Sequence, residues 1–484
     1  MLILAGTHSG CGKSTVTIGL LAALKRLGHD VQPFKAGPDF IDAGLHGMIA
    51  SRPSRNLDIW MCGIDYVRQC AKAHAGADLA ITEGVMGLFD GGERSTAALA
   101  GVLGANVVLV IDAGGMADSA GAIIKGFCEF NNGAGRIKGV IFNRVSSPSH
   151  FEKLRASCPA VDVSGHTVEI LGYLPRSAEY SIPSRHLGLT LAEERPLGDG
   201  ALNILAETVT RCIDLKKVCQ LAETGSRAGR TGGPQASRHG SQNSDFIEEK
   251  IDTSVKVAVA RDNAFCFYYE DNLDMLRLAG AEIVPFSPVS DQFLPEGIDA
   301  VYLGGGYPEV YARALSGNKG MTGAIKKWAD AGRPVFAECG GFMYLGEGIR
   351  HEGEFFPLCG VFPVTTGILK ETGGIKGGPS LGYREAVFSE DCMLGAKGER
   401  LRGHEFHYSQ VLQSREKPGV RFNIMGEDKI KITSAACKAT LAGYTHFHFG
   451  SNPHVAGNLV EFVRRSKKKK TGKEQVFLKN PWRS

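Results

Sequence analysis

The chain has 484 residues, of which 43% are hydrophobic and 22% charged, and its formal net charge is +4 at pH 7. This length predicts two to four domains, and so small a charge, much of it in the lysine run 467–470, argues against a nucleic-acid surface on the folded body. Twelve Cys without a C-x-x-C pair argue against a zinc ribbon, and no apolar run is long enough to span a membrane, so we expect a cytoplasmic protein.

The chain begins with an apolar run, residues 2–5, followed by the sequence GTHSGCGKST. Gly6 and Gly12 are separated by five residues, one more than in the standard phosphate-binding loop. The surroundings still favour such a loop, because apolar residues at helical spacing follow until Gly28. An ordinary glycine-rich turn is the alternative, but it has no use for a Lys-Ser pair at the helix start. The predicted phosphate-binding residues are Gly10, Gly12, Lys13, Ser14 and Thr15.

Further apolar runs alternate with helical stretches through the first half, at 31–37, 77–84, 107–114, 140–143 and 170–175. This alternation predicts an α/β domain, residues 1–221, with a mostly parallel sheet covered by helices on both faces. Residues 222–254 are rich in Gly, Ser, Arg, Gln and Asn, which predicts a flexible linker. Apolar runs resume at 255–262, 282–286, 300–306 and 334–339 and predict a second α/β domain, residues 255–466, before a basic tail, residues 467–484.

Carboxylates follow two predicted strands of the first domain. Asp39 and Asp42 come just after the second strand, while Glu83 ends the next strand and Asp90 lies in the glycine-rich loop beyond it. Open α/β sheets bind ligands at these strand ends, and Mg²⁺ on a triphosphate takes one or two protein oxygens. Ser14 with Asp39 or Glu83 would supply them. The alternative is that these acids cap helices and turns.

Three further residues near the strand ends are less specific. Lys35 would help to neutralise an anionic substrate, although lysines often only cover a surface. Asp112 and Asp118 follow the run 107–111 and are as compatible with turn capping as with ligand binding.

A candidate nucleophile, Cys339, lies in the second domain within the sequence AECGGF. It follows an apolar strand and precedes a predicted helix, residues 342–346. The glycines permit a sharp turn, the helix dipole is expected to lower the pKa of the thiol, and the backbone N–H of Gly340 is expected to face an oxyanion. Gly305, in the glycine run 304–306, is the candidate for a second oxyanion donor. The alternative is a buried, inert thiol.

A thiolate nucleophile also needs a base, and the sequence YTHFHF offers His446 and His448. On a strand both would face the same side, so their spacing leaves both open. The pairs His404 with His407 and His446 with His448 also suggest a metal site, but no third ligand with convincing spacing accompanies either pair, so we expect none.

Eight blocks together carry a family resemblance: GTHSGCGKST, KAGPDFID, TEGVMGLFDG, AFCFYYEDNLD, LGGGYPE, AECGGFMYL, LGYRE and RGHEFHYS. They cover nearly the whole folded chain, and on them the sequence resembles the cobyrinic acid a,c-diamide synthase family. The resemblance implies a P-loop domain of the dethiobiotin synthetase type, in which the same longer loop occurs. It also implies a second domain of the cobalamin-type class I glutamine amidotransferases, with a flavodoxin-like α/β fold.

The resemblance also implies an activity. Glutamine is hydrolysed at Cys339 through a thioester, with His446 as the base and His448 as its substitute. Ammonia then passes to the first domain, where ATP and Mg²⁺ activate two acetate groups of a corrinoid substrate as mixed phosphoric anhydrides. Asp42 and Asp90 are the expected catalytic acids there. The His-x-Glu sequence of other class I amidotransferases is not evident after His446, and Glu405 is the candidate carboxylate near the base.

Other functions are kept open at this point. The first domain alone is compatible with a nucleotide switch of the partition or maturation type, although such a switch has no need of the Cys339 turn. Within the enzyme class, Ni-sirohydrochlorin and hydrogenobyrinic acid are alternative tetrapyrrole substrates, because the motifs bind acetates and phosphates rather than the central metal. We expect neither a nucleic-acid nor a membrane partner, and a homodimer is one candidate for the oligomeric state.

Overall fold

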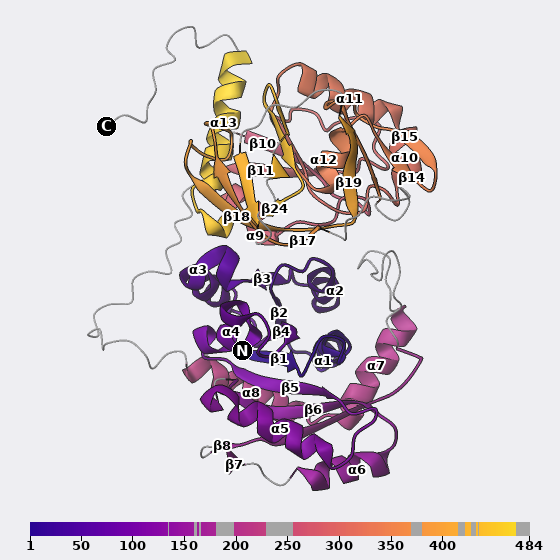
Figure 1. Ribbon diagram of the computed structural model, residues 1–484, viewed down its shortest axis with the longest axis vertical. Helices are drawn as coiled ribbons and strands as arrows, with labels where there is room; N and C mark the ends of the chain where they lie inside the picture. The colour runs from indigo at the N-terminus through magenta and orange to yellow at the C-terminus, as the bar shows by residue number, and fades with distance from the viewer. Residues whose placement is uncertain are drawn as a thin grey trace, which may run out of the picture. The chain divides into compact units, whose positions relative to one another are not determined.

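The computed structural model describes residues 1–133, 135–158, 162–163, 166–180, 198–228, 255–368, 380–414, 422–426, 432–433 and 435–470. The chain divides into two compact units, residues 1–241 and 242–484 (Figure 1). This division falls inside the segment predicted to be a linker.

One parallel sheet forms the centre of the first unit, with the strand order β3-β2-β4-β1-β5-β6-β9. Its strands are β1 Leu2–Gly6, β2 Val31–Ala36, β3 Arg55–Leu57, β4 Leu79–Gly87, β5 Asn106–Asp112, β6 Ile137–Val145 and β9 Glu169–Pro175, and the separate hairpin is β7 Asp162–Val163 and β8 His166–Thr167. The central strands are continuous apolar runs because both faces of the sheet are covered.

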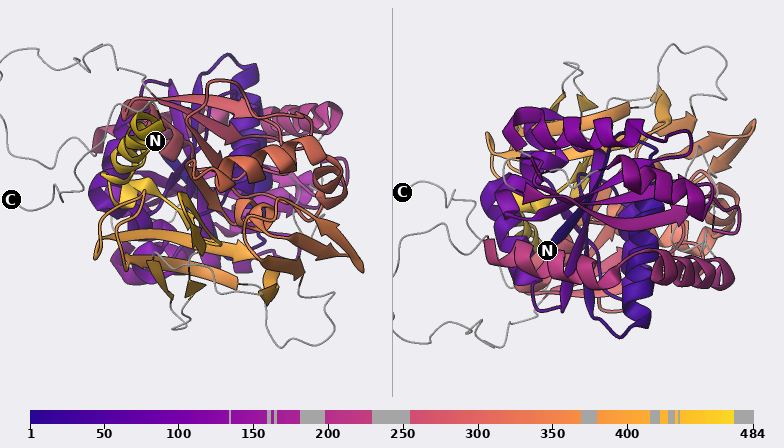
Figure 2. Two further views of the ribbon diagram at one scale, coloured as in Figure 1. Left: turned by 90° about the horizontal axis from the view of Figure 1, so that it is seen from above. Right: turned by 90° about the horizontal axis from the view of Figure 1, so that it is seen from below.

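Helices cover both faces of this sheet. They are α1 Lys13–Arg26, α2 Ile41–Ala50, α3 Ile59–Ala73, α4 Thr96–Leu103, α5 Ser119–Glu129, α6 Pro148–Ser157, α7 Asp199–Cys212 and α8 Leu215–Ala228, with the 3-10 turns η1 Gly92–Arg94 and η2 Phe130–Gly133. Residues of α1, α2, α7 and α8 share one core cluster with the sheet. In the right-hand view of Figure 2, α5 and α6 lie on the opposite side of the sheet from α7 and α8. The fold is therefore the three-layer α/β arrangement that the sequence predicts.

The second unit is built on a six-stranded sheet in the order β11-β10-β12-β13-β23-β22, parallel except for its edge strand β22. Its strands are β10 Val255–Ala260, β11 Ala281–Phe286, β12 Ala300–Leu303, β13 Val335–Glu338, β22 Ala435–Cys437 and β23 Thr440–Gly443. The flanking helices are α9 Glu270–Leu278, α10 Ala312–Gly317, α11 Lys319–Asp330, α12 Gly340–Leu345 and α13 Val455–Lys470.

Residues of β10 alternate between two core clusters, with Ala258 on one face and Val257 and Val259 on the other. The first cluster includes residues of α11 and α12, and the second includes residues of α9 and α13. Both faces of this sheet are therefore buried, which explains why its strands also read as continuous apolar runs.

Two smaller sheets extend the second unit, and the sequence analysis predicts neither of them. One has the order β15-β14-β16-β19, with β14 Gly348–His351, β15 Glu354–Pro357, β16 Val364–Ile368 and β19 Ser409–Ser414. The other has the order β21-β20-β17-β18-β24, with β17 Ser380–Phe388, β18 Arg400–His407, β20 Phe422–Gly426, β21 Ile432–Thr433 and β24 His446–Phe447, the last leading into the 3-10 turn η4 Phe449–Ser451.

Two boundaries differ from the predicted ones. Helix α8 continues to Ala228, so the predicted linker begins with helix, because Ala222 is buried in the core and its carbonyl accepts a hydrogen bond from the Met1 amino group. Helix α13 continues through the lysine run to Lys470, and Lys467 Nζ lies 3.0 Å from Asp299 Oδ2. Residues 229–254 and 471–484 lie outside the described residues.

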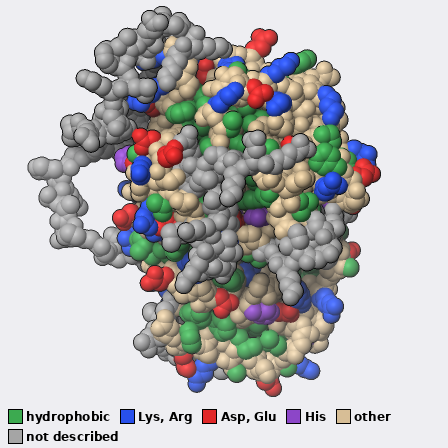
Figure 3. Space-filling model, turned by 45° about the horizontal axis from the view of Figure 1, so that its top comes forward, with side chains coloured by type: hydrophobic (Ala, Val, Ile, Leu, Met, Phe, Trp, Pro, Cys, Tyr) green, Lys and Arg blue, Asp and Glu red, His purple; other side chains and the backbone are tan. Residues whose placement is uncertain are grey.

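Across the described residues, no helix is long and apolar enough to cross a membrane. On the face drawn in Figure 3, Lys and Arg side chains are interspersed with Asp and Glu side chains.

Candidate functional site

The loop between β1 and α1 has the backbone of a phosphate-binding loop. Gly10 and Gly12 have φ angles of 85° and 94°, in the left-handed region that favours glycine. A Cβ at Gly12 would lie 1.9 Å from Nδ2 of Asn143, and that amide donates a hydrogen bond of 2.9 Å to the carbonyl of Cys11. Position 12 therefore requires glycine, and the end of β6 braces the loop.

Helix α1 begins at Lys13, where its N-terminus attracts anions. The Lys13 side chain is buried, and its Nζ points back over the loop, 3.4 Å from the carbonyl oxygen of His8. A loop that turns its backbone and a lysine toward the same space is suited to bind phosphate.

The next residue, Ser14, joins a buried cluster of charged side chains. Its Oγ donates to Glu83 Oε1 at 2.8 Å and to Asp42 Oδ2 at 3.3 Å. Lys35 Nζ lies 2.9 Å from Asp42 Oδ2 and 3.0 Å from Glu83 Oε1, because Lys35 and Glu83 are register partners on β2 and β4. His46, on α2, places Nε2 2.8 Å from Glu83 Oε2. The sequence analysis named Asp42 and Glu83 but not His46, and it underrated Lys35.

Burial and charge act against each other in this cluster. Burial raises the pKa of Glu83, but Lys35 and His46 outweigh it and hold this pKa well below its usual range. Burial, followed by the charge of Glu83, raises the pKa of Asp42 to about 7. Burial lowers the pKa of Lys35, but Asp42 and Glu83 outweigh it and raise this pKa, so Lys35 stays protonated.

The cluster also fits a hard divalent cation. Mg²⁺ prefers oxygen ligands, and the hydroxyl of Ser14 lies within hydrogen-bond distance of carboxylate oxygens of both Glu83 and Asp42. A cation there would replace the repulsion between the two carboxylates with attraction. Among the described residues, no group of three or more His, Cys, Asp or Glu side chains is arranged to hold a metal ion, so the hydroxyl and a phosphate would have to complete the site.

The two other acids named from the sequence have capping contacts instead. Asp39 Oδ1 accepts hydrogen bonds of 2.9 Å from the amides of Ile41 and Asp42 at the start of α2. Asp90 Oδ2 accepts one of 2.9 Å from the amide of Gly87. Both acids thus show the capping contacts that were the alternative interpretation.

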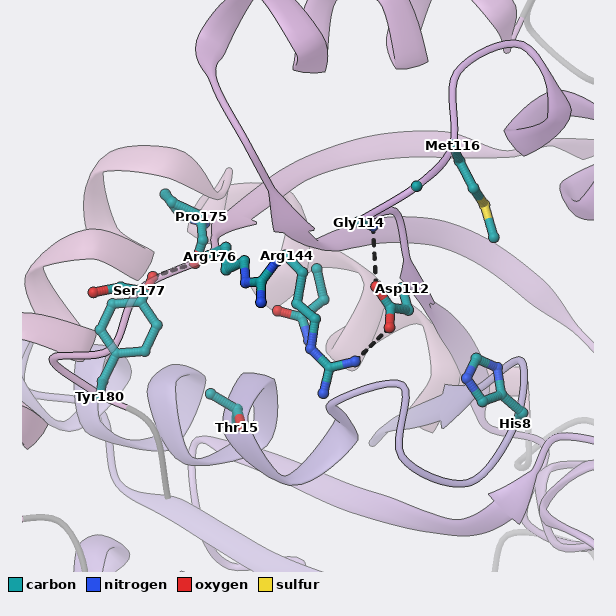
Figure 4. A pocket seen from close by; sticks show the side chains of 12 residues that line it. His8, Thr15, Asp112, Gly114, Met116, Arg144, Pro175, Arg176, Ser177 and Tyr180 are labelled. Carbon is teal, nitrogen blue, oxygen red and sulfur yellow. Dashed lines mark hydrogen bonds and ion pairs between the residues drawn. The ribbon is translucent and has the colours of Figure 1, made fainter. Parts of the chain in front are cut away.

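A pocket of about 770 Å³ lies beside the phosphate loop (Figure 4). Arg144 reaches across it to an ion pair with Asp112, whose other oxygen accepts a hydrogen bond of 3.0 Å from the amide of Gly114. The sequence analysis did not identify Arg144, because this residue lies in none of the recognised sequence blocks. The pocket is lined by His8, Thr15, Asp112, Gly114, Gly115, Met116, Asn143, Arg144, Pro175, Arg176, Ser177 and Tyr180.

In the second unit, Cys339 occupies a sharp turn between β13 and α12. Its φ of 46° and ψ of −101° lie outside the regions that a side chain readily adopts, which is typical of a strained functional residue. The Cys339 amide donates a hydrogen bond of 2.7 Å to the carbonyl of Gly443. A Cβ at Gly341 would lie 2.3 Å from the carbonyl oxygen of Leu303, so the turn requires glycine there.

Burial is the largest influence on the pKa of the Cys339 thiol. Burial raises its pKa well above the usual range, and Glu309 and Glu405 raise it further, whereas the N–H of Gly340 lowers it. The net shift is thus opposite to the lowering expected from the helix dipole, because burial raises this pKa more than the N–H of Gly340 lowers it.

The two late histidines occupy different environments. His446, on β24, pairs with His404 on β18, with ring centroids 5.1 Å apart, and a Cβ at Gly305 would lie 2.2 Å from its Cε1. Its ring thus lies against the glycine run 304–306. His448 instead caps η4, where its Nδ1 accepts a hydrogen bond of 3.1 Å from the amide of Gly450. Burial lowers the pKa of His446 to about 3 and that of His448 to about 4.

The glycine run meets the Cys339 turn at Gly306. The amide of Gly305 donates to the carbonyl of Phe267 at 3.2 Å. The amide nitrogen of Gly306 lies 3.2 Å from the position of a Cβ at Gly340. The structure thus brings the amide nitrogen of Gly306, rather than that of Gly305, beside the turn.

Glu405 is a buried carboxylate in the same neighbourhood. Its Oε1 accepts a hydrogen bond of 2.8 Å from Thr445 Oγ1, and its Oε2 accepts one of 3.0 Å from Arg384 Nε. Burial raises its pKa, but His407 and Arg384 outweigh it and lower this pKa to about 2. Glu405 therefore bonds to the residue before His446.

Comparison with known proteins matches both units. Residues 2–189 match the family described as the CobQ/CobB/MinD/ParA nucleotide binding domain, and residues 256–454 match the CobB/CobQ-like glutamine amidotransferase domain. A solved glutamine amidotransferase structure aligns with 43% of this chain and 97% of its own chain, at 16% identity and a TM-score of 0.31.

Three relatives match along nearly their whole length, and each is named cobyrinate a,c-diamide synthase. The protein of Syntrophotalea carbinolica is 41% identical over 96% of this chain and 98% of its own. The protein of Streptococcus sanguinis is 39% identical over 96% of this chain and 99% of its own. The protein of Priestia megaterium is 38% identical over 97% of this chain and 98% of its own.

Proposed function

The chain belongs to the cobyrinate a,c-diamide synthase family, and we propose that it amidates the a and c acetate groups of cobyrinic acid, with glutamine as the nitrogen donor and ATP as the driving force. One observation carries this proposal: the relatives match across both units, so an amidotransferase domain and a nucleotide-binding domain occur in one polypeptide.

We assign glutamine hydrolysis to the second unit. The Sγ of Cys339 attacks the side-chain amide carbon of glutamine, while His446 takes the thiol proton and later gives it to the departing ammonia. Water then hydrolyses the thioester to glutamate. A general base must be neutral to accept a proton, and burial, which lowers the pKa of His446, favours that form.

The tetrahedral intermediate of this reaction needs oxyanion donors. We propose the backbone N–H groups of Gly340 and Gly306 as these donors. Gly340 directly follows the nucleophile, and the amide nitrogen of Gly306 lies beside Gly340. Gly305, the donor expected from the sequence, is the less favoured candidate because its N–H already bonds to Phe267.

We assign amide synthesis to the first unit. The γ-phosphoryl group of ATP passes to an acetate oxygen, and ammonia then displaces phosphate from the mixed anhydride to form the amide. Lys13 stabilises the charge on the phosphoryl group, because phosphoryl transfer depends mainly on positioning and electrostatics. Lys35 holds Asp42 and Glu83 in place. The pocket of Figure 4 is the proposed site of the nucleotide base, because Thr15 and Asn143 connect it to the phosphate loop.

Mg²⁺ fits the oxygens of Ser14, Glu83 and Asp42 and would supply charge neutralisation between the phosphates when bound. Asp39 is a less favoured ligand, because its Oδ1 already accepts hydrogen bonds from two backbone amides. Asp90 orients the loop after β4 through the amide of Gly87. A homodimer and a cytoplasmic location remain predictions from the sequence.

The test of this function is a substrate comparison. The protein is incubated with ATP, Mg²⁺ and glutamine plus cobyrinic acid, hydrogenobyrinic acid or Ni-sirohydrochlorin, and the products are weighed by mass spectrometry. We expect cobyrinic acid to gain two amide groups with the highest kcat/KM. Efficient amidation of only one of the other macrocycles would reassign the substrate, and nucleotide hydrolysis without amidation of any macrocycle would favour a nucleotide switch.

A further inference from the structure

The strand that carries His446 is tied to the strand that carries Cys339 by a buried carboxyl group. Glu338 immediately precedes Cys339 at the end of β13, and its side chain is 3% exposed. Its Oε1 accepts a hydrogen bond of 2.9 Å from the amide of Phe447, the residue after His446. Its Oε2 accepts one of 2.8 Å from the hydroxyl of Tyr302 on β12. The side chain of Glu338, next to the nucleophile, therefore holds the backbone next to the base.

A second buried side chain holds the same backbone from the other direction. Asn272, on α9, is 1% exposed. Its Nδ2 donates a hydrogen bond of 2.7 Å to the carbonyl of Phe447, and its Oδ1 accepts one of 2.8 Å from the amide of Phe449. Both polar backbone atoms of Phe447 are thus bound by side chains.

These contacts fix a segment that has little regular structure of its own. Strand β24 consists of His446 and Phe447 only, and it pairs with β18 at two positions. The Cys339 amide bonds to Gly443, so two hydrogen bonds join residues 338–339 to residues 443–447. Glu338 and Asn272 thus add side-chain hydrogen bonds to a strand that consists of only two residues.

We propose that Glu338 and Asn272 are positioning residues for glutamine hydrolysis, which hold the backbone of β24 so that His446 faces the thiol of Cys339. A base usually needs a third group that orients it, and these two side chains orient the base through its backbone rather than through its ring. The inference rests on the proposed function, because it requires that Cys339 and His446 act as nucleophile and base.

The alternative is that Glu338 contributes only to the stability of the fold. Paired substitutions distinguish this structural role from the positioning of His446. Glu338→Gln keeps an acceptor for the amide of Phe447 and a polar partner for Tyr302, whereas Glu338→Leu has similar size and removes both. Each variant is assayed in the full-length protein for amidation with glutamine and, separately, with ammonium chloride. Thermal unfolding is recorded on the same preparations.

We expect Glu338→Leu to lower kcat with glutamine by about 10²-fold, the effect of misplacing a catalytic group by roughly 1 Å, while amidation with ammonium stays within about twofold. Glu338→Gln should restore most of the glutamine-dependent rate. Asn272→Asp replaces the donor to the Phe447 carbonyl with an oxygen that this carbonyl repels, so it should show a loss of the same kind. Equal loss with both nitrogen sources, or a Glu338→Gln variant as defective as Glu338→Leu, would overturn the proposal.

Two further measurements keep the test decisive. If Glu338→Leu does not fold, Tyr302→Phe and Asn272→Asp carry the comparison, and an unchanged ratio of glutamine- to ammonium-dependent rates in both would overturn the proposal. Cys339→Ala is assayed in parallel. If Cys339→Ala keeps glutamine-dependent amidation, the proposed function itself fails. If it loses that activity while Glu338→Leu keeps it, only the present inference fails.

Discussion

At the scale of single residues, the two candidate sites differ in the charge state that their surroundings favour. In the first unit, Lys35 keeps Glu83 ionised in a fully buried setting, so a charged cluster exists before substrate arrives. In the second unit, burial raises the pKa of Cys339 and lowers that of His446, so it favours the neutral form of both groups. Neutral groups avoid the large free-energy cost of burying an isolated charge. In the proposed mechanism, the charged forms arise only in the transition state with bound glutamine.

In the proposed mechanism, phosphoryl transfer depends most directly on Lys13. We expect Lys13→Ala to lower amidation by about 10²- to 10³-fold, as for removal of one donor that stabilises developing charge. The loss should be the same with glutamine and with ammonium, because the phosphorylated acetate is needed in both cases. Lys125→Ala, on the exposed surface of α5, is the matched control and should keep full activity. Retention of either reaction in Lys13→Ala would refute its role.

Glu338 gives a prediction for stability against pH. Burial raises its pKa to about 8, above the value of about 4.3 expected in the unfolded chain, so the folded state binds the extra proton between these values. The wild type should therefore lose stability relative to Glu338→Gln as the pH rises from about 4.3 to 8, with no further change above pH 8. Thermal midpoints measured across this range check it, and a constant difference between the two proteins would contradict it.

At the scale of elements, glycines bring the reactive strands close together. The run 304–306 lies against the imidazole of His446 and the Cys339 turn, and the loop before α1 fits under Asn143. In both places a Cβ would occupy space that another backbone or side chain already fills. A larger residue at such a position would therefore displace a candidate reactive group on a neighbouring element.

Gly305→Ala tests this close packing. Its Cβ would lie 2.2 Å from Cε1 of His446, so the ring must move, and we expect glutamine-dependent amidation to fall by about 10-fold or more while the ammonium-dependent rate is unchanged. The control is Gly323→Ala on α11, where no atom lies within 4 Å of the new Cβ. Equal glutamine-dependent rates in the two variants would show that His446 is not constrained by this glycine run.

The sequence predicts the elements whose signal is local. Apolar runs and glycine spacing predict the central strands of both units, helix α1 and the Cys339 turn. The blocks around Asp42, Glu83 and Cys339 point to the candidate sites. The small sheets of the second unit were missed because their strands are short and partly exposed, as in β15. His46, Arg144 and Asn272 were missed because their roles come from contacts across the fold, which no local pattern shows.

The same limit applies to the acids. Asp39 and Asp42 lie three residues apart and look equivalent in the sequence. In the fold, the start of α2 turns Asp39 toward backbone amides and Asp42 toward Ser14 and Lys35. Only the helix geometry distinguishes a cap from a member of the charged cluster.

At the scale of the whole molecule, the chain combines two units with separate chemistry. In the proposed mechanism, one unit splits nitrogen from an amide with a thiol and an imidazole, and the other uses a nucleotide to make a carboxylate reactive. Each unit has its own core and its own sheet. Because ammonia is the only species that must pass between the two reactions, free ammonia should replace the first reaction without affecting the second.

The most direct test of this division follows the nitrogen itself. Wild type and Cys339→Ala are each incubated with ATP, Mg²⁺ and cobyrinic acid, either with glutamine labelled with ¹⁵N at its amide or with labelled ammonium chloride, and the product is weighed by mass spectrometry. The account predicts that wild type incorporates label from both sources and that Cys339→Ala incorporates it from ammonium alone. Label from glutamine in the product of Cys339→Ala, or loss of amidation with both sources, would contradict it.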